Sequence, residues 1–193
     1  MQQQISVVTL GAVDLVRSKR FYVDGFGWNP VFENDEIIFY QMNGLMLGTF
    51  LQASLESDMN RGGLVRPGAF ALAHNVEGFG WKPVFENEEI IFYQMNGLML
   101  GTFLLGSLEA DMNRGGSVRP AAFSLGHNVP TREDVEPLID RLVSAGGTIM
   151  RPADAPPHGG FRGYVADPDD HAWEISWNAA WTIDENGLVT FGL

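Results

Sequence analysis

The sequence predicts an α+β protein built from paired modules, each of one helix and four strands (βαβββ). Three observations lead to this prediction. Short apolar runs rich in β-branched and aromatic residues recur between turn signals, which is the pattern of strands. Two stretches with helical periodicity, which begin near residues 14 and 131, divide the strands into two groups of similar order. A repeated strand-rich segment enlarges the predicted sheet.

That repeat is 53 residues long and occurs twice in tandem, at residues 24–76 (the first repeat) and 77–129 (the second repeat). The copies align without gaps, and 43 of the 53 positions are identical. Solenoids need three or more stackable units, so two copies between unrepeated ends do not make one. We interpret the pattern as a natural or engineered tandem duplication in a parent chain of about 140 residues, a typical size for one domain.

The first module begins with an apolar, β-branched run at residues 5–10, which predicts a strand. Asp14 is a good helix N-cap, and the residues after it predict a helix over 14–24 that ends at Gly25. Each repeat then predicts a three-stranded meander with an Asn-Gly hairpin turn, a loop or short helix, and one more strand. The predicted elements are 30–33, 36–42, 45–51, 54–60 and 70–76, with strands again at 83–86, 89–95, 98–104 and 123–129.

The second module continues with a helix capped by Thr131. Glu133 and Asp134 place negative charge in its first turn, and Gly146 and Gly147 end it. Its apolar residues lie on one face at helical spacing: Val135, Leu138, Ile139 and Leu142. Three strands follow, at 148–151, 160–166 and 172–177. We therefore expect residues 130–178 to complete the second module of one domain, and residues 179–193 to form a tail with a hairpin or strand.

Charge and composition exclude several classes of function. The formal net charge of −12 disfavours nucleic acid and anionic membranes as partners. No apolar run approaches the ~20 residues that cross a bilayer, and the N-terminus lacks a signal-peptide pattern. Cysteine is absent, so disulfide and thiolate chemistry are excluded and a cytoplasmic location is expected.

Several stretches resemble the vicinal-oxygen-chelate superfamily, which contains glyoxalases, bleomycin-resistance proteins and dioxygenases. VVTLG at residues 7–11 and DLVRSKRFYVDGFGW at 14–28 resemble its first strand and helix. DPDDHAWEISWN at 167–178 resembles its last strand. The resemblance covers residues 1–178 with the repeat counted once. It implies one glyoxalase-like domain, in which the paired modules form a curved, cup-like mixed sheet with helices outside.

Enzymes of that superfamily hold a divalent metal through His and Glu ligands from both modules. Carried over by position, the first-strand ligand corresponds to Val7, which cannot bind a metal. The fourth strand, residues 45–51, contains no Asp, Glu or His. His127, with His74 as its copy, and Glu174 are the two candidate ligands that remain. Because two protein ligands rarely hold a metal firmly, we expect no firm metal or other cofactor.

His127 and Glu174 can also be interpreted without a metal. As a pair they would act as acid and base in a partly apolar cup, where burial raises the pKa of the carboxyl. Alternatively, His127 is a hydrogen-bonded cavity residue and Glu174 is ion-paired to an arginine such as Arg162. The loop PPHGGFRGY closes over a ligand or is an ordinary hairpin connection. The expected ligand-binding residues are His74, His158, Phe161, Arg162 and Tyr164.

Alternation along the last strand places Trp173 and Trp177 on one face and Glu174 and Ser176 on the other. We expect the two indoles to pack in the core under a helix. His171, in the DPDDH turn, is expected to be a turn residue.

Three functions stay open. The protein is a metal-dependent lyase or dioxygenase, a metal-free protein that binds a small aromatic or hydrophobic molecule in its cup, or a duplicated variant without evolved activity. Val7 and the missing fourth-strand ligand favour the second and third. Three arrangements are open for the strands that the duplication adds: one copy is extruded as a loop, the strands join a larger sheet, or another chain buries them. We expect burial in a homo-oligomer, with domain swapping as one route, because exposed apolar edges are costly.

Overall fold

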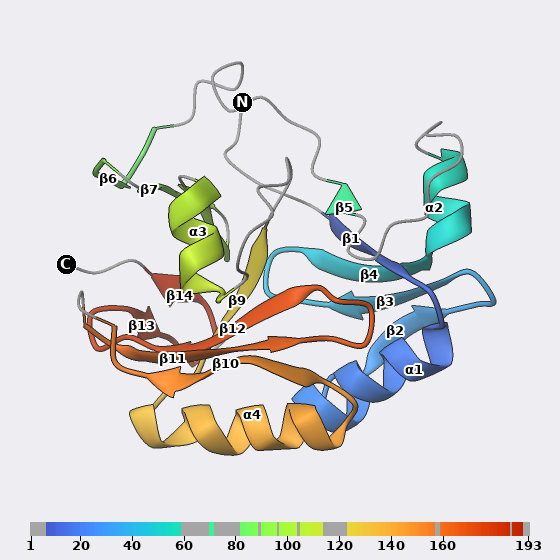
Figure 1. Ribbon diagram of the computed structural model, residues 1–193. Helices are drawn as coiled ribbons and strands as arrows, with labels where there is room; N and C mark the ends of the chain where they lie inside the picture. The colour runs from blue at the N-terminus through green and yellow to red at the C-terminus, as the bar shows by residue number, and fades with distance from the viewer. Residues whose placement is uncertain are drawn as a thin grey trace.

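The computed structural model describes residues 7–58, 70–71, 82–88, 90–95, 97–103, 105–113, 123–156, 159–185 and 187–190. Figure 1 shows two sheets side by side, with helices α1 and α4 beneath them and helix α3 on the opposite side of the second sheet. This arrangement confirms the predicted α+β class.

The first module is a five-stranded mixed sheet in the order β2-β3-β4-β1-β5. Its strands are β1 Val7–Ala12, β2 Pro30–Glu33, β3 Ile37–Gln41, β4 Met46–Leu51 and β5 Phe70–Ala71. The meander from β2 to β4 is antiparallel, and β1 runs parallel to β4. The short helix α2, Gln52–Asp58, follows β4 and contacts β1 and β4.

The helix after β1 begins where the sequence predicts and ends later. The Asp14 side chain accepts hydrogen bonds from two backbone N–H groups of the first turn, as an N-cap does. Helix α1, Leu15–Arg20, continues as the π-helical turn η1, Phe21–Phe26, and the chain leaves it at Gly27 with φ of 78°. The predicted end at Gly25 was wrong. Gly25 lies inside the turn, packed against Leu142, and Gly27 takes the left-handed conformation that ends the helix.

The second module is a four-stranded sheet in the order β10-β11-β12-β9, in which β9 runs parallel to β12. Its strands are β9 Ser124–Asn128, β10 Thr148–Asp154, β11 Phe161–Ala166 and β12 Ala172–Trp177. Helix α4, Val135–Ser144, follows the 3-10 turn η3, Arg132–Asp134. The apolar face predicted for this helix is buried: Val135, Leu138, Ile139 and Leu142.

The two repeats form the same local structure. In the second repeat, β6 (Phe85–Glu86), β7 (Ile90–Gln94) and β8 (Met99–Phe103) form an antiparallel sheet, followed by helix α3 (Leu105–Asp111). The pairing of Ile37 with Phe50 in the first meander recurs as Ile90 with Phe103, an offset of 53 for both partners. The repeats differ in what they join: β4 pairs with β1, whereas β8 pairs with β7 alone among the described residues.

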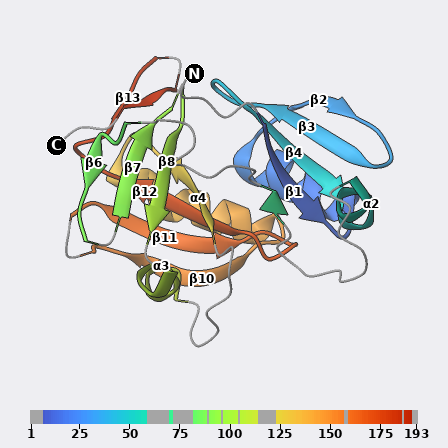
Figure 2. The same cartoon turned by 90° about the horizontal axis from the view of Figure 1, so that it is seen from above.

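The second meander packs on the C-terminal tail. The tail forms a hairpin of β13, Thr182–Ile183, and β14, Val189–Thr190. The rings of Phe92 and Trp181 lie 5.5 Å apart, and Leu98 packs against the main core. Seen from above, the meander lies over the β9 side of the second sheet (Figure 2). Its described residues are therefore packed against the protein and not extruded from it.

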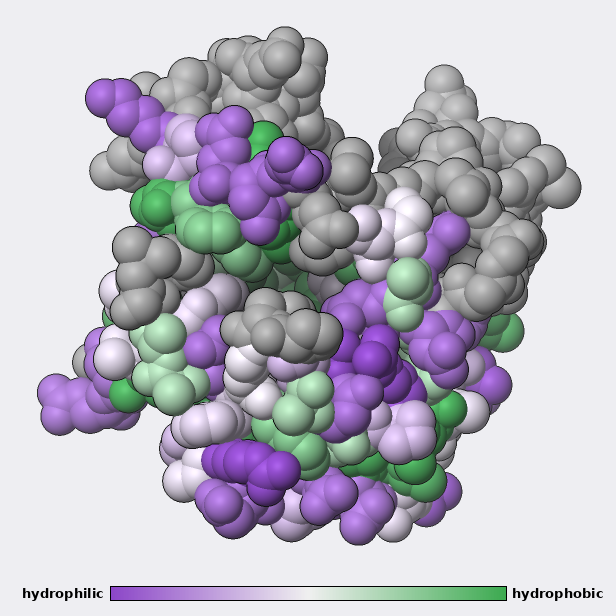
Figure 3. Space-filling view, turned by 60° about the vertical axis from the view of Figure 1, so that its left-hand side comes forward, coloured by the Kyte–Doolittle hydropathy of each residue, from purple (hydrophilic) through white to green (hydrophobic). Residues whose placement is uncertain are grey.

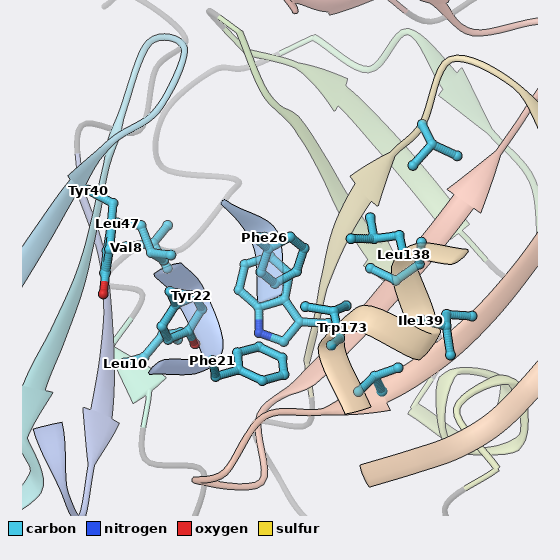
Figure 4. Packing of buried hydrophobic residues seen from close by; sticks show 14 of the residues in the cluster. Val8, Leu10, Phe21, Tyr22, Phe26, Tyr40, Leu47, Leu138, Ile139 and Trp173 are labelled. Carbon is cyan, nitrogen blue, oxygen red and sulfur yellow. The ribbon is translucent and has the colours of Figure 1, made fainter. Parts of the chain in front are cut away.

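The main core joins the two modules through the aromatic residues of η1. Figure 4 shows Phe21, Tyr22 and Phe26 between the side chains of the two modules. The rings of Tyr22 and Tyr40 lie 5.4 Å apart, and those of Phe26 and Trp173 lie 4.8 Å apart. Burial of large aromatic rings stabilises such a junction strongly. The helices and this core cover one face of the second sheet, which leaves the other face for a site.

Candidate functional site

The register of β11 and β12 gathers polar side chains on one face of the second sheet. Tyr164 pairs with Glu174, and Arg162 pairs with Ser176. Because successive side chains of a strand alternate between faces, these four residues share a face, which we call the cup face. Trp173 lies on the opposite face, in the core, as predicted.

Helix α3 of the second repeat covers part of the cup face with an acidic side chain. Asp111 Oδ1 accepts a hydrogen bond from Arg162 Nη2 at 2.6 Å, and Asp111 Oδ2 accepts one from the Tyr164 hydroxyl at 2.6 Å. Arg162 also pairs with Asp154, which in turn pairs with Arg151 Nη2 at 2.9 Å. The result is a partly buried ionic network that links α3, β10 and β11.

The network holds Asp111 in its charged form. Burial acts to raise the pKa of this carboxyl, but the hydrogen bonds from Tyr164 and Arg162 and the positive charges of Arg162 and Arg151 outweigh burial. The pKa of Asp111 is therefore lowered from its usual value. Burial, together with the negative charges of Glu174 and Asp111, raises the pKa of the Tyr164 hydroxyl, so this group donates its proton as a neutral phenol.

Glu174 lies beside this network and can change its charge near neutral pH. Burial and the negative charge of Asp111 raise its pKa to about 7, and the charge of Arg162 opposes them only in part. Among the described residues Arg162 pairs with Asp111 and Asp154 and not with Glu174. The expected ion pair of Glu174 with Arg162 is therefore not formed, because α3 supplies a competing carboxylate.

His127 lies on the other face of the sheet. In the parallel pairing of β9 with β12 it lies beside Ile175, so it shares the core face, and its ring centroid is 5.3 Å from that of Phe26. Burial and the charge of Arg141 lower its pKa to about 4, so the imidazole is neutral at pH 7. The structure therefore does not bring His127 and Glu174 together as an acid–base pair.

The other predicted site residues separate in the same way. Arg162 and Tyr164 join Glu174 on the cup face. Phe161 lies on the core face, where the Arg132 guanidinium stacks 4.0 Å from its ring centroid. His74 and His158 lie outside the described residues.

His171 is buried beside the DPDDH turn, with its Nδ1 3.0 Å from a carboxylate oxygen of Asp167. The same oxygen, Asp167 Oδ2, accepts a hydrogen bond from the Tyr22 hydroxyl at 2.6 Å. The turn therefore fixes the end of β11 against the first module, which fits the structural role expected for His171.

Sequence reasoning did not find Asp111, Arg151 or Asp154. Asp111 belongs to DMNRGG, a string without a known motif, and its position in the network depends on where α3 packs. A usable signal was present in β11: Arg162 is flanked by buried apolar positions, and a buried arginine requires a carboxylate partner. The sequence could have prompted a search for that partner without identifying it.

The cup face does not fit a divalent metal. Within the described ranges no group of three or more His, Cys, Asp or Glu side chains could hold one. The residue of β9 beside Glu174 is Gly126, which has no ligand atom in its side chain, and the Arg162 cation is near enough to affect the pKa of Glu174. A second positive charge at this place would be repelled by the guanidinium.

Two βαβββ modules that share a core, with a polar cluster on the face opposite their helices, define the architecture of vicinal-oxygen-chelate proteins. Residues 4–175 match the family described as the Glyoxalase/Bleomycin resistance protein/Dioxygenase superfamily. The chain belongs to this superfamily.

Solved structures agree with this assignment. A glyoxalase-related enzyme from Fulvimarina pelagi is 42% identical, with 99% of both chains covered and a TM-score of 0.68. A glyoxalase/bleomycin resistance protein/dioxygenase family enzyme from Burkholderia phytofirmans PsJN is 14% identical over 90% of this chain and 98% of its own, with a TM-score of 0.56. A lactoylglutathione lyase from Agrobacterium tumefaciens is 15% identical over 95% of this chain and 100% of its own, with a TM-score of 0.52. The last two show the fold alone. No curated protein matches the chain.

Proposed function

We propose that this protein binds a small organic molecule on the cup face without a metal, and that Glu174 exchanges a proton or a hydrogen bond with it. The observation that carries the proposal is the pKa of Glu174, raised to about 7 beside Arg162 and Tyr164. A carboxyl with a pKa near neutral donates a hydrogen bond in one state and accepts one in the other, which suits binding or general acid–base chemistry.

The surroundings of Glu174 support an organic ligand. Next to the polar groups, Tyr164, Ala172 and Met112 form a small buried apolar cluster, with Leu108 and Met150 against it. Apolar walls with a few converging polar groups are typical of small-molecule sites. We infer a ligand with an apolar or aromatic body and at least one polar group directed at Glu174.

A metal-dependent lyase or dioxygenase is the second candidate, which membership of the superfamily favours. Metal analysis of purified protein after dialysis separates the two. Metal-free protein whose melting temperature rises with a small aromatic ligand supports the first proposal, whereas one retained metal per chain supports the second. Protein that does neither supports a duplicated variant without evolved activity.

Variants connect the ligand to Glu174. Glu174→Gln removes the titrating group, so we expect the ligand-induced rise in melting temperature to shrink at least threefold and to lose its dependence on pH between 6 and 8. Glu136→Gln on the exposed face of α4 makes the same chemical change far from the cup face and serves as the matched control. An equal response of both variants would contradict the role of Glu174.

We also infer that the protein is a homo-oligomer. This inference is independent of the site and rests on apolar side chains at the edges of the two meanders. Apolar side chains are exposed at the outer edges of the two meanders: Val31 (58%) and Phe32 (51%) in β2, and Val84 (46%) just before β6. Figure 3 shows hydrophobic patches between hydrophilic areas on the described part of one side. Two nearly identical repeats also make an exchange of strands between chains feasible.

Two expectations about the surroundings of the protein have different support. Among the described residues no helix is long and apolar enough to cross a membrane. The cytoplasmic location stays a prediction from the absence of cysteine.

A further inference from the structure

Asp111 is held on the cup face in the way that a protein holds the carboxylate of a ligand. Its two oxygens accept from two different donors, Arg162 Nη2 and the Tyr164 hydroxyl, both at 2.6 Å. The donors lie two residues apart on β11, and they are 4% and 1% exposed. Arginine and a neutral phenol on a rigid strand form a preorganised pair of donors for a carboxylate.

The donors do not depend on Asp111 for their position. The Arg162 guanidinium also pairs with Asp154, and Tyr164 is packed against Ala172 and Met150. Within the described residues the buried Nε of Arg162 has no hydrogen-bond partner, so the guanidinium keeps an unused donor. Without Asp111, the positive charges of Arg151 and Arg162 would face the single carboxylate of Asp154 and the partly ionised Glu174. The vacated place would therefore attract an anion.

The element that carries Asp111 is short. Helix α3 has seven residues, too few for a stable helix without tertiary contacts. Its end is held by the Asp111 side chain and by Met112, which is buried against Tyr164. Two hydrogen bonds to β10 add to this, from Arg151 Nη1 to the Asp111 carbonyl at 2.8 Å and from Asn113 Nδ2 to the Met150 carbonyl at 3.1 Å. The same sequence, DMNRGG, begins at the last residue of α2 in the first repeat, and α2 packs against β1 and β4 instead.

We propose that Arg162 and Tyr164 form a binding site for the carboxylate of a small monocarboxylic acid, and that Asp111 occupies this site as an internal substitute until the ligand displaces it. This inference rests on the proposed function and adds the class of ligand. The apolar cluster beside the donors would receive the body of the acid, and Glu174 would lie close to its carboxylate end. Internal occupation lowers the apparent affinity, because a ligand binds only the fraction of molecules in which Asp111 has left.

Acetate tests the proposal, because it is the aspartate side chain cut at Cβ. In Asp111→Ala the donors lose their internal partner, so acetate should raise the melting temperature saturably, measured against sodium chloride at equal ionic strength and pH. We expect an apparent affinity at least tenfold tighter than in the wild type. Asp58→Ala, the same change in the first repeat, is the matched control and should respond to acetate as the wild type does. Equal acetate dependence of Asp111→Ala and the wild type would overturn the proposal.

Two further variants keep the test decisive. Asp111→Ala combined with Arg162→Met should lose the acetate response, and retention of the response would show that acetate binds elsewhere. If Asp111→Ala does not fold, Asp111→Asn keeps the shape of the side chain but removes its charge. It should bind benzoate at least tenfold more tightly than the wild type, and an unchanged affinity would overturn the proposal.

The same data separate this inference from the proposed function. Neutral aromatic ligands that stabilise the wild type through Glu174, with no acetate response in Asp111→Ala, would leave the proposed function standing and remove the carboxylate site. A saturable acetate response without any effect of Glu174→Gln on a ligand would do the reverse.

Discussion

His127 lies beside Ile175 in the pairing of β9 with β12, one residue out of step with Glu174. This single step places the imidazole in the aromatic core and the carboxyl on the cup face. Burial favours the neutral form of each group, so it lowers the pKa of His127 and raises the pKa of Glu174. The two groups therefore make the free energy of unfolding depend on pH in opposite directions.

Glu174 should make the folded state less stable as pH rises. Its pKa is about 7 in the folded protein, against 4.5 for an ordinary glutamate. Between these values the folded state binds more protons than the unfolded state, so the free energy of unfolding falls with rising pH. The free energy of unfolding of Glu174→Gln, relative to that of the wild type, should therefore be higher at pH 7.5 than at pH 5 by on the order of 2 kcal/mol. Urea unfolding of both proteins at the two pH values measures this difference. A pH-independent difference between the two proteins would contradict the raised pKa.

His127 should act in the opposite direction. Its pKa is about 4 in the folded protein, against 6.5 for an ordinary histidine. Stability from the neutral imidazole is present above pH 6.5 and is lost as pH falls toward 4, because the unfolded state then binds more protons. Between pH 7.5 and pH 5, the free energy of unfolding of His127→Phe should fall by about 2 kcal/mol less than that of the wild type. Urea unfolding at the two pH values measures this difference. The two effects nearly cancel in the wild type, so a flat wild-type profile with sloping variants is the expected result.

Removal of either repeat should leave a protein that folds. The meanders share one register, so the second repeat can offer β8 to β1 where the first repeat now offers β4. We expect chains lacking residues 24–76 or 77–129 to show the circular dichroism of the full chain and one cooperative thermal transition. Failure of both deletions to fold cooperatively would show that the repeats depend on each other.

Solution mass should exceed that of one chain. Size-exclusion chromatography with light scattering is expected to give a dimer or a larger assembly, because the edges at Phe32 and Val84 expose apolar side chains. Phe32→Lys or Val84→Lys should shift the protein toward monomer. Val143→Lys, on exposed α4, changes a side chain of similar exposure away from both edges and should not. A compact wild-type monomer would contradict this prediction.

The fold could be predicted from the sequence because its signals are local. Asp14, Thr131 and the Asn-Gly turns each specify an element through their immediate neighbours. The face on which a site residue lies was predictable along β12, where alternation separates Trp173 from Glu174. It was not predictable between strands, because the register of β9 against β12 is set by tertiary packing. Asp111 was missed for the same reason, since its partners on β11 lie about fifty residues further along the chain.

The shared register of the two meanders has a consequence for how the chain assembles. Either meander could pair with the edge of β1, through β4 or through β8. However, β4 begins at Met46, 34 residues after the end of β1 at Ala12, whereas β8 begins at Met99, 87 residues after it. Closing the longer loop costs about 0.8 kcal/mol more, and the nearer copy also leaves the ribosome earlier. Proximity along the polypeptide, rather than any difference in content between the copies, therefore assigns the place beside β1 to the first meander. The second meander is left as a spare copy of β2 to β4, whereas α3 and β9 of the same repeat stay part of the second module.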